Sequence, residues 1–217
     1  MNNRIEINKK IIELTTSDIC GDNNYVRIDD MIDSSKYKCK IYICGNNNSI
    51  VIKNPQKIGK LSISIGSERC PINNCKVEIG DNSNIGELRM HVESDNSSVT
   101  IGEDLLMSWG EVIRIGNQPH LIFDLESGEY IDGPYNFEIG NHCWVGEGCM
   151  LLSKTKVPDG CIVGAMSVVT NPFNEQNCVI AGNPASIKKR NIYWAKNVHN
   201  ISHEKYKESF IRYKNEK

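Results

Sequence analysis

The sequence lacks the long hydrophobic runs that membrane proteins need. None of its apolar stretches approaches about eighteen residues. The charges scattered through residues 1–20 do not match the pattern of a signal peptide. The formal charge of the 217 residues is only -2, so bulk charge suggests no nucleic-acid or membrane surface as a partner. We therefore expect a cytoplasmic protein with no membrane span and no bound nucleic acid.

Paired cysteine motifs are also missing. The nine cysteines include no C-x-x-C pair, and in a chain without an export signal they are better explained as reduced thiols than as disulfides. The sequence therefore gives no reason to expect a metal site. Cys143, Cys149 and Cys161 occupy one fixed place in the repeat described next, where a thiol acts as a compact hydrophobe.

What the sequence does have is a six-residue repeat between residues 139 and 170. Aliphatic residues return at every sixth position, a period that neither an α-helix nor a flat strand enforces. Half of the residues that follow them are glycine, and a small residue stands four positions after nearly all of them. This is the signature of a hexapeptide β-helix, in which three units close a triangular coil and the aliphatic side chains point inward. The aliphatic residues are Ile139, Val145, Leu151, Val157, Val163 and Val169.

The repeat is less regular toward the N-terminus. Aliphatic residues followed by glycine recur at Ile79, Ile85 and Ile101, but the spacings between such groups are not all multiples of six. We therefore expect a β-helix with irregular early coils over residues 39–184. Residues 1–38 show no clear repeat and are expected to form an N-terminal cap or an irregular segment, because a solenoid needs its end covered.

Three segments depart from the repeat. A short helix or irregular turn is expected near residues 10–14. Residues 117–138 contain no six-residue ladder and are rich in glycine, proline, asparagine and aspartate, which indicates an inserted loop. Long loops on a rigid scaffold usually carry function. From residue 185 the pattern becomes helical, so residues 185–217 are predicted to form a tail with a short C-terminal helix.

The second half of the chain carries motifs that resemble a known family. They are HCWVG at 142–146, VPDG at 157–160, IVGA at 162–165, SVVT at 167–170 and AGNPA at 181–185. Together they resemble the left-handed β-helix acyltransferases, and in particular the branch that O-acetylates bacterial sialic acids and capsular polysaccharides. The resemblance implies an all-β fold, a left-handed parallel β-helix of hexapeptide repeats. It also implies a homotrimer that binds acetyl-CoA between neighbouring subunits and uses a loop histidine to activate a hydroxyl of a carbohydrate acceptor.

The loop histidine of that family corresponds to His120. A hydroxyl must lose its proton as it attacks a thioester, and a neutral imidazole is well suited to accept that proton. Asp124, four residues later, either orients the imidazole or caps a turn of the loop. The sequence departs from the family just before the histidine, where Gln118 and Pro119 stand in place of an acidic and a small residue.

Two tryptophans are candidates for the acceptor site. Trp144 directly precedes the inward-facing Val145, so it should face outward, where a large apolar ring needs a partner. It either stacks on the sugar or the pantetheine arm, or packs against the inserted loop or a neighbouring subunit. Trp144 or a backbone N–H is also the expected donor to the oxyanion of the reaction. Trp109 either narrows the acceptor pocket or fills an interface.

Five residues are candidates for binding the coenzyme. Gly146, Gly164 and Ala165 allow a close approach to the amide-rich pantetheine arm, although such residues also suit the corners of a coil. Thr170 matches a family position beside the nucleotide end. Lys188 begins the one downstream basic cluster and either meets the ribose phosphate or lies on a solvated face.

The sequence thus predicts an acetyl-CoA-dependent O-acetyltransferase that modifies a sugar of a bacterial surface polysaccharide. Two alternatives remain open. One is N-acetylation of an amino sugar, because an amine needs less help from a base than an alcohol does. The other is a hexapeptide scaffold without catalytic activity, since a fold alone does not fix a function.

Overall fold

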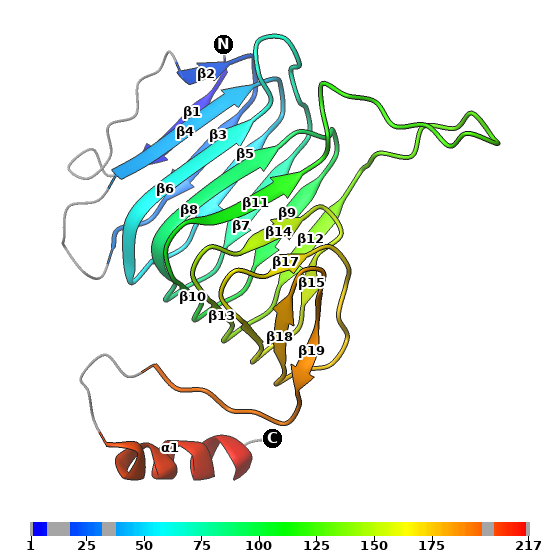
Figure 1. Ribbon diagram of the computed structural model, residues 1–217. Coiled ribbons are helices and arrows are strands. Elements are labelled where there is room, and N and C mark those ends of the chain that lie inside the picture. The colour runs from blue at the N-terminus through cyan, green and yellow to red at the C-terminus, as the bar shows by residue number, and fades with distance from the viewer. Residues whose placement is uncertain (1, 8–17, 32–37, 197–201, 216–217) are drawn as a thin grey trace.

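The computed structural model describes residues 2–7, 18–31, 38–196 and 202–215 and shows a parallel β-helix with three faces (Figure 1). The first face is a seven-stranded parallel sheet, in which each strand pairs with its counterpart in the next coil. Its strands are β1 (Arg4–Ile7), β3 (Tyr25–Ile28), β5 (Ser49–Ile52), β7 (Lys76–Ile79), β9 (Ser98–Ile101), β12 (Asn136–Ile139) and β15 (Lys156–Val157).

A second sheet of twelve strands forms the other two faces. It is continuous because the long strands β6 (Lys57–Ile65) and β8 (Asn84–Val92) bend through the corner between these faces. The second face continues through β10 (Leu106–Met107), β13 (Trp144–Val145), β16 (Ile162–Val163) and β18 (Val179–Gly182). The third face contains β2 (Ile19–Cys20), β4 (Lys38–Cys44), β11 (Glu111–Ile115), β14 (Met150–Leu152) and β17 (Val168–Val169).

The core is a stack of aliphatic side chains along the axis of the β-helix. All six residues of the predicted ladder from Ile139 to Val169 are buried, with at most 2% of their surface exposed. Parallel pairing places similar side chains above one another; for example, Ile139 lies between Ile101 and Val157. The predicted period of six and the inward orientation of these residues are therefore confirmed.

The repeated cysteines are buried at the places where the chain leaves one face for the next. The thiols of Cys143 and Cys149 donate to the carbonyl oxygens of Pro158 and Gly164, at 3.2 and 3.1 Å. Burial raises the pKa of Cys143 to about 12, so this thiol stays protonated at neutral pH. All nine cysteines are free thiols. The prediction that the repeated cysteines act as compact hydrophobes is confirmed.

Asparagine ladders hold the corner between the third and first faces. Asn23, Asn47, Asn74 and Asn96 have φ values of 56 to 59°, a left-handed conformation that asparagine tolerates better than most residues. The side-chain amide of each of the first three donates to the next asparagine of the series, at 2.8, 3.0 and 3.1 Å. The early coils thus gain a stabilising contact that does not depend on a six-residue period.

Two predicted boundaries are wrong. The β-helix does not begin at residue 39, because β1 pairs with β3, and β3 pairs with β5. The turns between these early strands vary in length, and this variation hides the repeat in the sequence. Residues 185–189 are not helical but form β19 (Ala185–Lys189), which turns back antiparallel to β18.

The helical tail is confirmed farther on, as α1 (His203–Asn215). The helix or turn expected near residues 10–14 lies outside the described residues. Within the described part of the chain, no helix is long and apolar enough to cross a membrane.

Candidate functional site

The inserted loop projects from the β-helix as a long arm (Figure 1) and spans residues 116–135. Its predicted end at residue 138 is also wrong, because β12 already begins at Asn136. The base of the arm is held by Asp132, a buried carboxylate that accepts hydrogen bonds from the backbone and the side chain of Asn117, at 3.2 and 3.0 Å, and from the hydroxyl of Tyr135. Burial and the bond to Asp132 raise the pKa of Tyr135 to about 12. Asp132 therefore clamps the two legs of the arm together. Sequence reasoning missed it, because it is one of several acids in a polar loop.

His120 lies exposed on this arm. Its backbone N–H donates to the carbonyl of Asn117 at 3.0 Å, whereas its imidazole forms no hydrogen bond with any described residue. Asp124 accepts hydrogen bonds from the backbone N–H and hydroxyl of Ser127, at 2.8 and 3.0 Å, and from the backbone of Glu126. These bonds lower the pKa of Asp124. Of its two predicted roles, the geometry supports the capping of a turn.

A pocket of about 300 Å³ lies at the base of the arm. Thr170 is one of its lining residues, together with the cationic side chains of Arg114 and Lys154 and the apolar side chains of Ile122 and Ile131. Thr170 therefore lies at the corner between the third and first faces. The other predicted coenzyme-binding residues are elsewhere.

The corner between the second and third faces is formed by residues 108–110, 146–148 and 164–166, and we call it the glycine corner. Its three turns are stacked by backbone hydrogen bonds. The N–H of Gly148 donates to the carbonyl of Trp109 at 2.9 Å, and the N–H of Met166 donates to the carbonyl of Glu147 at 2.8 Å. The coils approach so closely that a Cβ on Gly146 would lie 2.7 Å from the nitrogen of Ala165.

Four predicted coenzyme-binding residues lie along this edge of the molecule. Gly146, Gly164 and Ala165 belong to the glycine corner itself. Lys188 extends the line, because its Nζ lies 3.7 Å from the point where a Cβ on Gly182 would stand. The basic cluster is partly neutralised, since the Arg190 guanidinium pairs with Glu175 at 2.7 Å.

Trp109 is mostly exposed but lies against its own chain. Its ring covers Gly59 and Gly86, where an added Cβ would meet ring atoms at 3.4 and 3.2 Å. These two glycines leave room for the indole at the N-terminal end of the glycine corner. Either predicted role remains compatible with the exposed side of the ring.

Trp144 faces outward from β13, as predicted, and is 37% exposed. On the second face it stands between Leu106 and Ile162, its partners on the adjacent strands. Its ring centroid lies 6.1 Å from that of Trp194, and the two rings are tilted by 48°. In this chain the partner of Trp144 is therefore a later segment, which sequence reasoning did not identify.

Glu111 is a buried acid that sequence reasoning also missed. It is fully buried, and neither of its carboxylate oxygens has a hydrogen-bond partner. Burial raises its pKa to about 7, and the carboxylates of Glu147 and Glu87 act in the same direction. Glu111 pairs with Leu88 of the previous coil, so it occupies a place that an aliphatic side chain fills elsewhere. An acid two residues before the inward-facing Ile113 was the signal in the sequence.

The candidate residues are thus distributed around the β-helix. The arm carries His120, and the pocket at its base contains Thr170. The glycine corner lies between the other pair of faces, and Trp144 lies on the second face. One chain therefore does not gather these parts into a single pocket. Among the residues that the structure describes, no group of three or more His, Cys, Asp or Glu side chains is arranged to hold a metal.

A parallel β-helix with a six-residue repeat, an inserted arm and stacked glycine turns is the architecture of the hexapeptide-repeat proteins, a class that includes acyltransferases. Comparison with known proteins is more specific: the chain belongs to the acetyltransferase family that includes the polysialic acid O-acetyltransferases. It is 31% identical to the polysialic acid O-acetyltransferase of Neisseria meningitidis over 202 residues, which cover 92% of this chain and 88% of that protein. Because the family is enzymatic, the non-catalytic scaffold is no longer an alternative.

Two further comparisons agree. The polysialic acid O-acetyltransferase of Escherichia coli O1:K1 / APEC is 32% identical over 121 residues, but the match spans only 38% of that longer protein. The crystal structure of the polySia specific acetyltransferase NeuO superposes with a TM-score of 0.66 at 23% identity, covering 96% of this chain and all of that one. This likeness confirms the left-handed β-helix. No family model matches the chain.

Proposed function

We propose that this protein transfers acetyl from acetyl-CoA to a hydroxyl of a sialic acid, or of another sugar, in a bacterial surface polysaccharide. The observation that carries the proposal is the similarity to the neisserial polysialic acid O-acetyltransferase over nearly its whole length. The arm and the glycine corner support it, since they offer a free imidazole and a line of closely stacked backbone. The proposal places the reaction in the cytoplasm, where acetyl-CoA is available.

The proposed active site forms between copies of the chain in a homotrimer. The support is geometric, because the arm with His120 projects away from the body that carries the glycine corner (Figure 1). In the trimer, Gly146, Gly164 and Ala165 of one copy bind the pantetheine arm, and Lys188 meets a phosphate. The arm of the next copy brings His120 to the thioester, and Thr170, at the base of that arm, lies near the nucleotide.

The reaction is a direct attack without a covalent enzyme intermediate. As the sugar oxygen attacks the thioester carbonyl, the neutral imidazole of His120 accepts the hydroxyl proton. The tetrahedral oxyanion needs a hydrogen-bond donor, and the indole N–H of Trp144 or a backbone N–H fills this role. Collapse breaks the carbon–sulfur bond, and the imidazolium returns the proton to the departing thiolate. Trp109 borders the acceptor, and Asp124 keeps the turn of the arm in shape.

Replacing His120 by Ala tests the base. We expect turnover to fall by about 100- to 10,000-fold, because general-base help is typically worth that much, while coenzyme binding stays unchanged. Acetyl transfer to oligomeric sialic acid and calorimetric titration with acetyl-CoA measure the two quantities. His91→Ala, a histidine on the outside of the third face, is the matched control and should keep full activity. Unchanged turnover in His120→Ala would remove His120 from the mechanism.

The chemical bond in the product distinguishes the two remaining activities, O-acetylation and N-acetylation. An O-acetyl ester is cleaved by mild alkali, whereas an N-acetyl amide resists it. We expect the acetyl group on the product to be released by mild alkali, and a stable product from an amino sugar would replace the proposal by N-acetylation. Sedimentation of the native protein tests the trimer, and a monomer that is fully active would contradict the shared site.

A further inference from the structure

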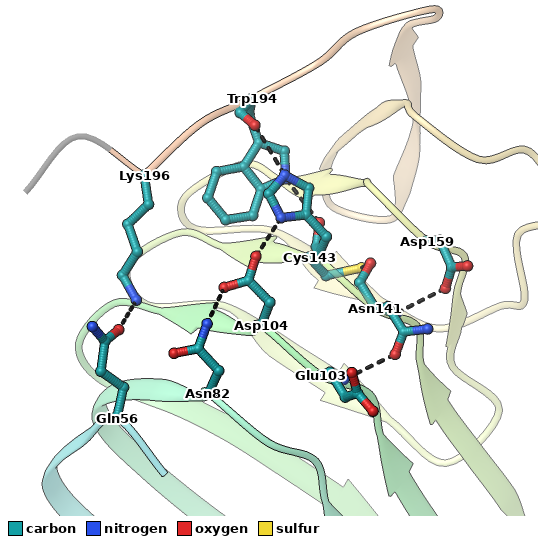
Figure 2. A network of polar contacts seen from close by, with 10 residues as sticks. Gln56, Asn82, Glu103, Asp104, Asn141, Cys143, Asp159, Trp194 and Lys196 are labelled. Carbon is teal, nitrogen blue, oxygen red and sulfur yellow. Dashed lines mark hydrogen bonds and ion pairs between the residues drawn. The ribbon is translucent and has the colours of Figure 1, made fainter. Parts of the chain in front are cut away.

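Residues 192–196 run back along the β-helix after β19, and we call them the strap. Trp194 lies at its centre and is only 7% exposed. Its indole stacks on the imidazole of His142, with ring centroids 4.2 Å apart and planes at 10°. Two hydrogen bonds close the contact: His142 Nε2 bonds to the carbonyl of Trp194, and Trp194 Nε1 donates to the carbonyl of His142, both at 2.9 Å. Figure 2 shows Trp194 above this network.

His142 is itself fixed by the corner of the β-helix. It has a φ of 52° and occupies a corner place where the previous coils carry Asn82 and Asp104, also with positive φ. Its Nδ1 lies 2.6 Å from Oδ2 of Asp104, and Asn82 donates to the other oxygen of that carboxylate at 3.0 Å (Figure 2). Both ring nitrogens thus lie within hydrogen-bond distance of an oxygen, and together these contacts fix the orientation of the ring.

The strap is also tied down beyond Trp194. Lys196 Nζ donates to Oε1 of Gln56 at 2.5 Å (Figure 2). The carbonyl of Lys196 accepts from the hydroxyl of Tyr206 at 3.0 Å, and Tyr193 lies 5.6 Å from Phe210 of α1. Contacts on both sides of Trp194 therefore hold it in place.

We propose that the strap positions Trp144 for acetyl transfer, and that Trp194 is the positioning residue. Trp144 sits on a strand of two residues, with Leu106 and Ile162 on either side in the sheet. Those neighbours do not cover the indole completely, since it is 37% exposed. Trp194, locked to His142, supplies the missing wall and leaves one side of Trp144 open to ligand. The inference rests on the proposed function, because it assumes that Trp144 acts on the reacting groups.

The first test is spectroscopic and needs no substrate. The chain has three tryptophans, so a Trp109→Phe, Trp194→Leu variant reports on Trp144 alone. We expect the time-resolved anisotropy of Trp144 to show fast local motion in this variant. A Trp109→Phe, Trp194→Phe variant keeps a ring at the strap and should restore the slow decay. Equal decays with Leu and Phe would overturn the proposal.

The second test is kinetic and uses single variants. We expect Trp194→Leu to lower kcat by about tenfold to a hundredfold, since small misplacements in a site have such effects, with little change in the affinity for acetyl-CoA. Trp194→Phe should recover most of the loss. Tyr42→Leu, which removes an outward-facing aromatic ring from β4 on the third face and has no contact with the strap among the described residues, should keep full kcat. Unchanged kcat in Trp194→Leu would also overturn the proposal.

A variant at His142 keeps the proposal testable if Trp194→Leu does not fold. His142→Asn restores the residue type that Asn82 has in an earlier coil, so it suits the corner but removes the stacking partner of Trp194. On the Trp109→Phe, Trp194→Phe background, where Trp144 is the one remaining tryptophan, it should make the local motion of Trp144 faster, and a slow anisotropy decay in that variant would count against the proposal. If the wild type transfers no acetyl to any sugar, the proposed function fails, while the anisotropy still decides whether the strap holds Trp144.

Discussion

The corner between the second and third faces is built in two ways along the same chain. In the early coils, Ile63 is the fifth residue after the inward-facing Ile58, and β6 bends through the corner without a break. In the later coils, Leu151 is the sixth residue after Val145, and the strands are pieces of two or three residues separated by a turn. One additional residue per coil therefore changes a bent strand into a corner.

We also assign different roles to the coils with and without the additional residue. A continuous strand has its backbone groups engaged in the sheet, whereas a turn leaves some of them free to meet a ligand. Gly146, Gly164 and Ala165, which we assign to the coenzyme, all lie at corners of the later kind. The early coils extend the stacked core and carry the asparagine ladder. The comparison teaches that all three residues we assign to the pantetheine arm lie in the stretch of strict hexapeptide period.

Among the variants that test this difference between early and late coils, placing a side chain in the glycine corner should cause the largest loss of stability. In Gly146→Val, the Cβ meets the backbone of Ala165 at 2.7 Å, and we expect unfolding to require about 3 kcal/mol less free energy. Acetyl-CoA binding should be lost with it. Gly110→Ala is the control. No atom lies within 4 Å of the point where its Cβ would stand, so only the positive φ of this residue lowers the stability, by about 1 kcal/mol. Urea unfolding and calorimetry measure both, and equal losses would contradict the close approach of the coils.

Removing the charge of Glu111 tests the same difference between the early and the late coils. Glu111 occupies a position that leucine fills in the two preceding coils. Its pKa is raised from 4.5 to about 7, so the unfolded chain releases the proton first and stability falls as the pH rises between these values. Glu111→Gln should be more stable than the wild type by about 2 to 3 kcal/mol at pH 8, with little difference at pH 4. Urea unfolding at both pH values measures this. A constant difference across pH would show that Glu111 does not keep its proton.

Interrupting the asparagine ladder should have the smallest effect. Asn47→Gly keeps the left-handed backbone but removes the bonds from Asn23 and to Asn74, so we expect a loss of about 1 kcal/mol. Asn191→Gly is the control, since Asn191 has a φ of 52° but no side-chain hydrogen bond to a described residue. Similar thermal unfolding of the two variants would mean that the ladder adds nothing beyond its backbone conformation.

The period of the sequence predicted the later coils well and the early ones poorly. From Ile139 to Val169 each inward residue is six positions from the next, so the pattern alone predicted a β-helix, whereas its left-handed sense came from the resemblance to the acyltransferase family. In the early strands, buried and outward-facing residues alternate with a period of two, and the coils differ in length. The sequence pattern therefore suggested separate short strands. β19 was mistaken for a helix because five residues are too few to distinguish the two periods.

The candidate site was predictable where chemistry or period marked a residue. His120 stood out as the histidine of the inserted loop, and the position of Trp144 beside Val145 fixed its outward orientation. The contact between His142 and Trp194 joins residues 52 positions apart. No repeat links them, so only the folded chain shows it. Asp132 and Glu111 were missed for a related reason, because burial and not residue type makes each of them unusual.

The hairpin of β18 and β19 ends the second face of the β-helix. A parallel solenoid presents unpaired N–H and C=O groups on its last coil, and copies that stacked there would grow into an open filament. β19 covers the edge of β18 with a strand of opposite direction, and its own edge carries the exposed charges of Lys188 and Lys189. The hairpin that brings Lys188 to the glycine corner therefore also closes the second face of the β-helix against the addition of a further parallel strand.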